Sequence, residues 1–276
     1  MNRILLLSVV ILVCLWSCKT KAPAVEKVNE TVQTTTAPTT SPSTVGGIPE
    51  IHETHGMRHI SKAVSQPVLD GVGADKAWTK ADWRNMDQVI EGEAPSPKDF
   101  QGRYKLLWDE NMIYILAEIQ DDKFMDQTKN GLFNYTDDDC LEIFIDENYS
   151  GGDHQYNYTA FAYHLSMDDK VVDLGLDGKP HYYTDHMEIS KKKNGNTIVW
   201  EVGLKVYGDR YYDKDKEASR VKLSEGKRMG FMMAYCDNDN SAKRETYIGD
   251  MHIDREDKDY AWIDAGLFGQ IMLNGK

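Results

Sequence analysis

Positive charge is scarce in this chain. Its 276 residues include 32 lysines and arginines against 45 aspartates and glutamates, which gives a formal net charge of -13 at pH 7. Nucleic acids and anionic membrane surfaces would repel a protein with this charge. The composition therefore excludes both as binding partners.

The chain also lacks an apolar run long enough to cross a bilayer comfortably, which takes about 20 residues. A shorter apolar run, Ile4 to Leu15, follows Arg3 and ends just before Ser17 and Cys18. This order is typical of a signal peptide. The segment resembles a bacterial lipobox, which implies removal of residues 1–17 and lipidation of Cys18. We therefore expect an exported protein, lipid-anchored at the periplasmic or surface face of the outer membrane.

Cysteines are few, and two of the four fall in or beside this leader. Cys14 lies in the apolar run and Cys18 is the expected lipidation site, which leaves Cys140 and Cys236. Neither has the spacing of a metal or redox motif. Both lie in apolar, strand-like segments, so we expect either two buried thiols or an inter-strand disulfide formed in an oxidising compartment.

Residues 18–49 contain almost nothing that could form a core. The stretch from Thr31 to Thr44 is mainly threonine, proline, serine and alanine. Such a composition is typical of a flexible, disordered tether. A chain of this length has an end-to-end distance of roughly 30 Å, enough to hold a domain clear of a membrane.

The remaining residues, 50–276, show neither an internal repeat nor a long helical period; from about Gly56, short apolar runs alternate with glycine, asparagine and aspartate. This pattern predicts an all-β domain, a two-sheet antiparallel β-sandwich. Trp78, Trp83, Trp108 and Trp200 lie in or beside alternating segments, and we expect them in the core. The predicted strands are 106–108 and 112–119, which flank a turn at 109–111, then 140–145, 156–165, 170–174, 197–204, 229–236 and 268–273.

Six short motifs occur in a characteristic order: Gln66–Gly71, Asp75–Trp78, Leu107–Ile115, Asp138–Asp146, Gly226–Phe231 and Phe268–Leu273. Together they resemble the family 9 carbohydrate-binding modules. The resemblance implies a sandwich that binds sugars without cleaving them, clamps a terminal sugar between two aromatic rings, and holds structural calcium in some members. Pyranose C–H groups pack on aromatic faces, and carboxylates and amides match sugar hydroxyls.

The resemblance also implies site residues. Glu142 matches the motif carboxylate, Tyr135 is the ring expected before it, and Asp259 and Trp262 match an Asn-x-x-Trp motif, with Trp262 as the second ring. Gln155 and Asn157 resemble a polar ligand strand, although the family's arginine is absent there. Simpler roles stay open: Glu142 as an ion-pair partner across strands, Trp262 at the edge of the core, and Gln155 and Asn157 on a polar strand face or turn.

Two acidic clusters are candidate calcium sites, because calcium prefers six to eight oxygen ligands. Asp137 and Asp138 belong to the first, and Asp237 and Asp239 to the second. Solvated turns are the alternative, since neither cluster has EF-hand spacing. We expect no other cofactor.

The predicted function is non-catalytic binding of an oligosaccharide or polysaccharide in glycan utilisation. One alternative is a haem-binding electron-transfer domain of the same fold, with axial ligands from Met229, Met232, Met233 or His164. Another is a glycoside hydrolase, which needs two carboxylates, one with a raised pKa. The last is a structural or adhesive lipoprotein with a degenerate sugar site.

Overall fold

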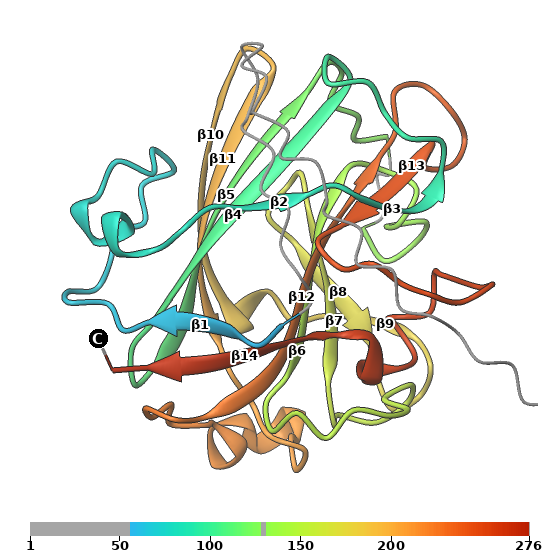
Figure 1. The fold of residues 1–276 in the computed structure, drawn as a ribbon. Helices are drawn as coiled ribbons and strands as arrows, with labels where there is room; N and C mark the ends of the chain where they lie inside the picture. The colour runs from blue at the N-terminus through green and yellow to red at the C-terminus, as the bar shows by residue number, and fades with distance from the viewer. Residues whose placement is uncertain (1–55, 128–130, 276) are drawn as a thin grey trace, which may run out of the picture. The chain divides into compact units, whose positions relative to one another are not determined.

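The computed structural model describes residues 56–127 and 131–275. The expected signal peptide, the lipidation site Cys18 and the tether lie outside the described residues. The described residues form two sheets packed face to face, as Figure 1 shows. The predicted all-β sandwich is therefore confirmed.

The larger sheet has nine strands, and all strand pairs in the described residues are antiparallel except β1 with β14. Its main order is β1 (Arg58–Ser61), β14 (Gly269–Asn274), β12 (Arg228–Asp237), β6 (Cys140–Asp146), β7 (Phe161–Ser166), β8 (Val171–Leu174) and β9 (Pro180–Tyr182). A branch adds β13 (Thr246–Gly249) beside β12, and β3 (Gln88–Gly92) beside β13.

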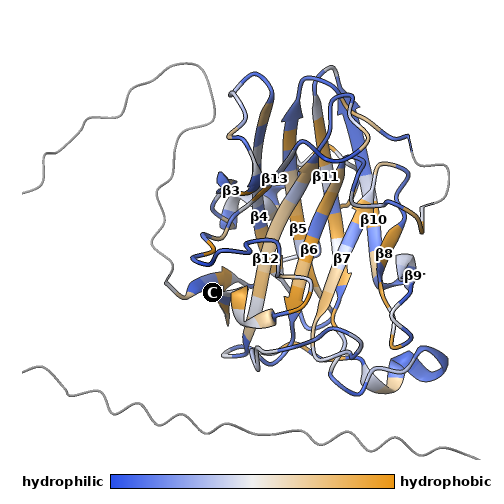
Figure 2. Cartoon of the chain, turned by 90° about the vertical axis from the view of Figure 1, so that its right-hand side faces the viewer, coloured by the Kyte–Doolittle hydropathy of each residue, from blue (hydrophilic) through white to orange (hydrophobic). Residues whose placement is uncertain are grey.

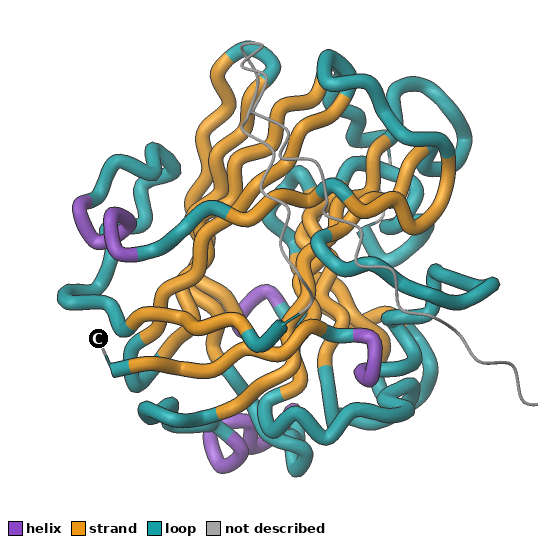
Figure 3. Tube along the Cα trace, viewed as in Figure 1, coloured by secondary structure: helices purple, strands orange, loops and turns teal. Residues whose placement is uncertain are grey.

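The smaller sheet has five strands, in the order β10 (Met187–Asn194), β11 (Thr197–Lys205), β5 (Met112–Asp121), β4 (Phe100–Trp108) and β2 (Arg84–Met86). Short 3-10 helices lie in the connections, as Figure 3 shows: η1 (Lys76–Lys80), η2 (Thr184–His186), η3 (Asp213–Ser219) and η4 (Ala265–Leu267). Among the described residues, no helix has the length and apolar character needed to span a membrane.

Alternating side chains build the core between the sheets. Leu141, Ile143 and Ile145 of β6 meet the core residues of β11, such as Trp200 and Val202. Because successive strand residues point to opposite faces, Cys140, Glu142 and Phe144 point away from this core. Figure 2 shows the hydrophobic colour concentrated along the central strands and the hydrophilic colour along the loops.

The N-terminal motifs pack on the outer face of the five-stranded sheet and are held there by Glu201 of β11. The indole N–H of Trp78 donates to Glu201 Oε1 at 2.8 Å, and the backbone N–H groups of Asp70 and Gly71 donate to Oε2 at 3.0 and 2.8 Å. Gly71 has a φ of +76°, and a Cβ there would lie 2.5 Å from the Lys191 carbonyl carbon. Only glycine fits this turn.

Three of the four tryptophans predicted in the core are buried, namely Trp78, Trp108 and Trp200. Trp83, which was also predicted in the core, is only partly buried. Its ring lies on the outer face of the five-stranded sheet, 4.2 Å from the Arg103 guanidinium carbon. A cation over the ring face stabilises an indole that the core does not enclose.

All eight predicted strand segments contain a strand, but one begins too early. The strand predicted at 156–165 starts at Phe161. Asp153 and Asn157 accept hydrogen bonds from backbone N–H groups two residues ahead, so they hold residues 153–159 in turns. The prediction that Gln155 and Asn157 lie on a polar strand was therefore wrong, and the turn alternative holds.

Candidate functional site

The outer face of the nine-stranded sheet carries a polar cluster at its centre. The strand register places six residues side by side across six strands: Tyr182, Val172, His164, Glu142, Ala234 and Gly249. Glu142 therefore lies on a central strand, with β7 on one side and β12 on the other. Two loops cover this face, residues 131–139 before β6 and residues 250–268 before β14.

Glu142 is only 2% exposed and is fully engaged by its neighbours. Its Oε1 accepts from the Cys236 thiol at 3.0 Å and lies 3.1 Å from His164 Nε2. Its Oε2 accepts from the Tyr247 hydroxyl at 2.7 Å. Of the two predicted roles for Glu142, the structure shows the ion pair across the strands.

Charge explains how this buried carboxylate stays ionised. Burial alone would raise the pKa of Glu142, but the charge and hydrogen bond of His164, followed by the charge of Arg244, lower it to about 2. Burial would likewise lower the pKa of His164, but Glu142 raises it to about 9. The two groups therefore form a charged pair over the neutral pH range.

Arg244, in the loop between β12 and β13, connects this buried pair to the surface. Its guanidinium lies 4.4 Å from the centre of the Tyr247 ring, and Nη1 lies 4.0 Å from Glu142 Oε1. Nη2 pairs with Asp259 and, at 2.7 Å, with the exposed Glu91. Burial raises the pKa of Asp259, although Arg244 opposes this. Sequence reasoning missed Arg244 altogether.

The two predicted rings belong to the two loops that cover this face. Tyr135 is half-buried, and its ring packs edge-on against His164 at 4.8 Å between ring centres. Trp262 is 36% exposed. It follows Ala261, which is buried in the outer-face apolar cluster and whose carbonyl lies 2.8 Å from His154 Nε2. Neither ring lies in the core between the sheets.

Of the other predicted site residues, Asp259 joins the cluster and Asn157 does not. Asn157 Oδ1 accepts from the backbone N–H and the hydroxyl of Thr159 at 2.9 and 2.6 Å. Its amide donates to the Asp153 carbonyl at 3.1 Å. Asn157 thus shapes its own turn, and Gln155 lies half-exposed in the same turn.

Cys140 and Cys236 are buried free thiols that face each other directly across β6 and β12. Of the two predicted alternatives, buried thiols and an inter-strand disulfide, the structure shows the buried thiols. Burial, followed by contact with Cys140, raises the pKa of Cys236 well above its usual value. The Cys236 thiol therefore remains protonated and can donate to Glu142.

A second polar cluster lies where the ends of β5 and β12 meet. Carboxylate oxygens of Asp121, Asp237 and Asp239 lie within 4.8 Å of one another. Burial, reinforced by the charge of Asp121, raises the pKa of Asp237 to about 7 and that of the neighbouring Asp139 to about 9. Asp239 Oδ1 is buried and has no hydrogen-bond partner within the described residues. A hard cation would satisfy all these oxygens.

This cluster coincides with only one of the two predicted calcium sites. Asp237 and Asp239 belong to it, whereas Asp137 and Asp138 are not among the described residues that group there. Asp138 Oδ1 instead accepts from the backbone N–H of Gln127 at 3.1 Å. Asp121, at the end of β5, was missed because only the tertiary fold brings it to β12.

The suggested haem ligands are divided between two faces. Met229 and Met233 pack in the core between the sheets, and Met232 packs in the outer-face apolar cluster. Both ring nitrogens of His164 already have partners, Glu142 and the Ala162 carbonyl at 3.0 Å. The haem hypothesis gains no support from this placement.

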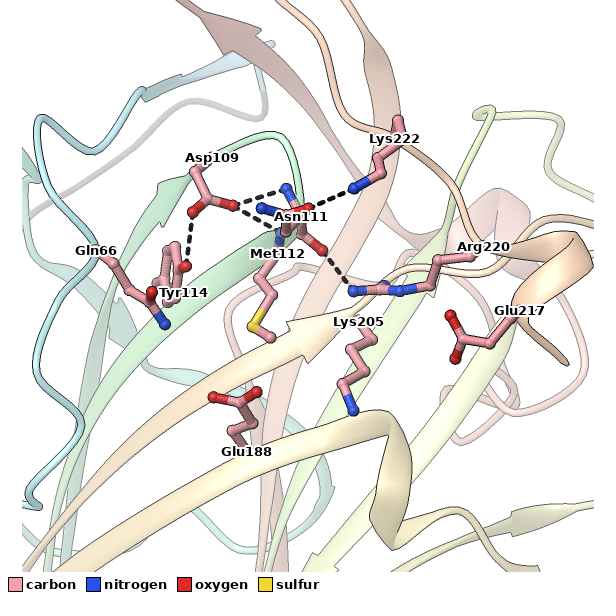
Figure 4. A pocket seen from close by; sticks show the side chains of 10 residues that line it. All are labelled: Gln66, Asp109, Asn111, Met112, Tyr114, Glu188, Lys205, Glu217, Arg220 and Lys222. Carbon is pink, nitrogen blue, oxygen red and sulfur yellow. Dashed lines mark hydrogen bonds between the residues drawn. The ribbon is translucent and has the colours of Figure 1, made fainter.

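A separate pocket of about 620 Å³ opens on the outer face of the five-stranded sheet (Figure 4). Its lining is strongly polar, and several of its charged groups already have partners. Arg220 donates to the Asn111 carbonyl at 2.7 Å, Lys222 to Asn111 Oδ1 at 2.5 Å, and the Tyr114 hydroxyl to Asp109 at 2.8 Å. Without an exposed ring in its lining, this pocket lacks the flat face that sugars favour.

Comparisons with known proteins agree with this architecture. Two structures of a family 9 carbohydrate-binding module from Caldicellulosiruptor kristjanssonii, one with cellotriose and one with glucose, superpose with TM-scores of 0.57 and 0.56. Their identities are 21% and 22%, covering 80% and 79% of this chain and 95% and 97% of theirs. A putative carbohydrate-binding protein from Bacteroides uniformis has a TM-score of 0.55 at 9% identity, covering 79% of this chain and all of its own.

In sequence, the chain is 31% identical over 221 residues to endo-1,4-beta-xylanase C of Paenibacillus barcinonensis. The match covers 80% of this chain but only 18% of that enzyme's length. The family model described as "Carbohydrate family 9 binding domain-like" matches residues 69–276. The chain therefore belongs to the carbohydrate family 9 binding domain-like proteins, whose domain is a non-catalytic binding module.

Proposed function

We propose that the outer face of the nine-stranded sheet binds a saccharide unit between Tyr135 and Trp262. One observation carries this proposal: a network of charged groups runs from Glu142 through Arg244 to Asp259 and the exposed Glu91, and the loops that carry both rings cover that same face. The rings supply apolar faces for sugar C–H groups. Arg244 and Asp259 supply the donors and the acceptor for vicinal hydroxyls.

In this proposal Glu142 lies beneath Arg244 and orients it. Because it is buried and already holds His164, Tyr247 and the Cys236 thiol, it positions Arg244 electrostatically instead of contacting the sugar first. Arg244 is then a preorganised donor, which lowers the entropy cost of binding.

The relatives guide the choice of ligand. Two structural neighbours hold cellotriose and glucose, and the related enzyme is a xylanase. We therefore propose a glucose- or xylose-based glycan as the ligand. The purified protein would be applied to a glycan array and then titrated calorimetrically with the sugars that bind. Binding that is lost in Arg244→Ala and Trp262→Ala supports the site, whereas an array without any signal would overturn it.

We also propose that the domain is tethered by lipid at Cys18, with residues 18–49 as a spacer that would hold the domain clear of a bacterial outer membrane. The leader pattern of residues 1–18 supports this. In a Gram-negative host, mass spectrometry of the full chain should find an acylated Cys18 at the amino end. Cys18→Ala should release the protein from the membrane fraction, and an unmodified Cys18 would refute the tether.

We further propose that calcium binds Asp121, Asp237 and Asp239 and ties the ends of β5 and β12 together. The unpartnered Asp239 Oδ1 and the raised pKa of Asp237 support this, because both mark negative charge without a counterion. Calcium at about 100 times its Kd should raise Tm by about 5 to 10 °C over the chelated protein. Asp121→Asn should remove this response. An unchanged Tm in about 10 mM calcium would contradict the site.

A further inference from the structure

Two tyrosines beside the proposed sugar site have exposed rings. Tyr182, on β9, is 47% exposed, and Tyr156, in the turn before β7, is 54% exposed. Leu176 and Phe133 are exposed nearby, in the β8–β9 turn and in the loop before β6. Soluble proteins rarely gather exposed apolar side chains unless the surface binds something.

Tyr182 is continuous with the site through the sheet register. It pairs with Val172, which pairs with His164, which pairs with Glu142. With about 4.8 Å between neighbouring strands, Tyr182 lies roughly 14 Å from Glu142 on the same face. A Cβ on Gly131 would lie 3.0 Å from the Tyr182 hydroxyl, so the loop that carries Tyr135 also touches Tyr182.

Tyr156 is continuous with the other side of the site. The turn that carries it is fixed to the Trp262 segment, because the backbone N–H of His154 donates to the Ile263 carbonyl at 2.8 Å. At its other end the Tyr156 ring lies against the β8–β9 turn, where a Cβ on Gly178 would be 2.8 Å away. Tyr156 thus lies between Trp262 and the β8–β9 hairpin.

The backbone of Tyr156 argues that stability alone does not explain this residue. Its φ is +63°, in the left-handed region, which costs a bulky side chain on the order of 1 kcal/mol. Asparagine tolerates this conformation better. Tyr149 has a similar backbone conformation, so strain alone does not indicate binding. Tyr156 differs in its position, because its exposed ring lies in the turn that is bonded to the Trp262 segment.

We propose that Tyr156 and Tyr182 are additional sugar-stacking positions and that the ligand is an oligosaccharide of at least three units. This inference rests on the proposed sugar site at Arg244 and Trp262. A monosaccharide held there does not reach Tyr182 across three strand spacings, whereas a longer chain does. Each further ring adds apolar contact without new charged groups.

The test is a calorimetric titration of the full-length protein with glucose, cellotriose and cellohexaose, and with the matching xylose series. The hexaose of the series that binds should bind at least tenfold more tightly than its monosaccharide. Tyr182→Thr, which keeps strand preference, and Tyr156→Asn, which fits the left-handed backbone, should each weaken hexaose binding about tenfold. Both should leave monosaccharide affinity within twofold, and Tyr156→Asn should keep or raise Tm.

Tyr149→Asn is the matched control. Tyr149 is also a tyrosine with positive φ, at +56°, and is 40% exposed, but it lies at the β6 end of the same loop, with its ring against Arg228 of β12. This variant should bind the hexaose like the wild type. Equal affinity for monosaccharide and hexaose, or an equal loss in Tyr149→Asn, would overturn the inference and leave the sugar site standing. No binding of any of these sugars would overturn the proposed function as well.

Discussion

The sandwich buries one glutamate on each outer face, and the two have very different surroundings. Glu201, on the five-stranded sheet, accepts from the Trp78 indole and from the backbone of Asp70 and Gly71. Glu142, on the nine-stranded sheet, is held by His164 and lies near Arg244, which continues to exposed carboxylates.

The difference separates a structural carboxylate from one that serves a site. Neutral donors enclose Glu201 and fasten the N-terminal motifs to the sheet, so its network ends inside the protein. Compared with a well-packed apolar pair of similar volume, a buried ion pair such as Glu142 with His164 adds little net stability, because desolvation offsets the attraction. Breaking the pair is costly, because one buried charge is then left alone. The pair's connection through Arg244 to the surface is the reason that we place the proposed binding site on this face.

The largest effect should come from Glu201→Ala. It leaves three donors without their acceptor, and we expect the free energy of unfolding to fall by about 4 kcal/mol. Denaturant unfolding measures this, and Glu201→Gln, which keeps one oxygen, should lose less. Sugar affinity of the folded protein should not change. A weakened affinity would show that the two faces are not independent.

The next effect is a pH dependence from the pair on the other face. The pKa of Glu142 is lowered from 4.5 to about 2 and that of His164 is raised from 6.5 to about 9. The stabilisation of the folded state by this pair is fully present between about pH 4.5 and 6.5. It is lost as pH rises from 6.5 through 9, because unfolded histidine has released its proton, and as pH falls from 4.5 through 2.

For His164 this loss amounts to about 3 kcal/mol. Urea unfolding at pH 6 and pH 9 measures it. Burial raises the pKa of Asp173 to about 7, so Asp173 also contributes a stabilisation of the fold that is lost as pH rises. His164→Gln isolates the histidine and should flatten the dependence. Equal slopes in wild type and variant would exclude the charged pair.

Trp262→Ala should weaken sugar binding about 30-fold, or about 2 kcal/mol, because a stacking ring is lost. Since Trp262 is partly exposed, the free energy of unfolding should change much less. Calorimetric titration and denaturant unfolding compare the two quantities. A large loss of stability with unchanged affinity would assign Trp262 to the edge of the core.

The smallest effect is expected in the pocket of the five-stranded sheet. Lys222→Ala removes its bond to Asn111 at the pocket's rim. Sugar affinity should stay within about 0.5 kcal/mol of the wild type, as for most surface substitutions. A marked loss of affinity in the same titration would move the binding site to this face.

Sequence patterns predicted most of the long strands and missed most of the short or polar ones, although only the last three residues of β4 were predicted and the short β8 was found. β6 and β11 alternate over a full strand, so one dry face is visible in the sequence. β9 and β13 have three and four residues, too few to show a period. β10 contains Lys191, Lys192 and Lys193, because it lies at the edge of its sheet, where lysine discourages pairing with other chains.

Only those site residues that lie in a recognisable sequence motif could be predicted. Glu142 and Trp262 lie in motifs, but whether Glu142 pairs or binds depends on His164, which the β6–β7 register places beside it. Arg244 lies in a polar loop without periodicity, and its position follows from the pairing of β12 with β13. Long-range pairing of this kind leaves no local signal in the sequence.

The parallel pairing of β1 with β14 has a consequence for the order of folding. β1 comes first in the domain and β14 last, and they lie side by side in Figure 1. Arg58 of β1 also bonds to Tyr104 and to the Phe231 carbonyl. A growing chain therefore carries its first strand unpaired until nearly all of the domain has been synthesised. We therefore expect the pairing of β1 with β14 to be a late step in the folding of the domain.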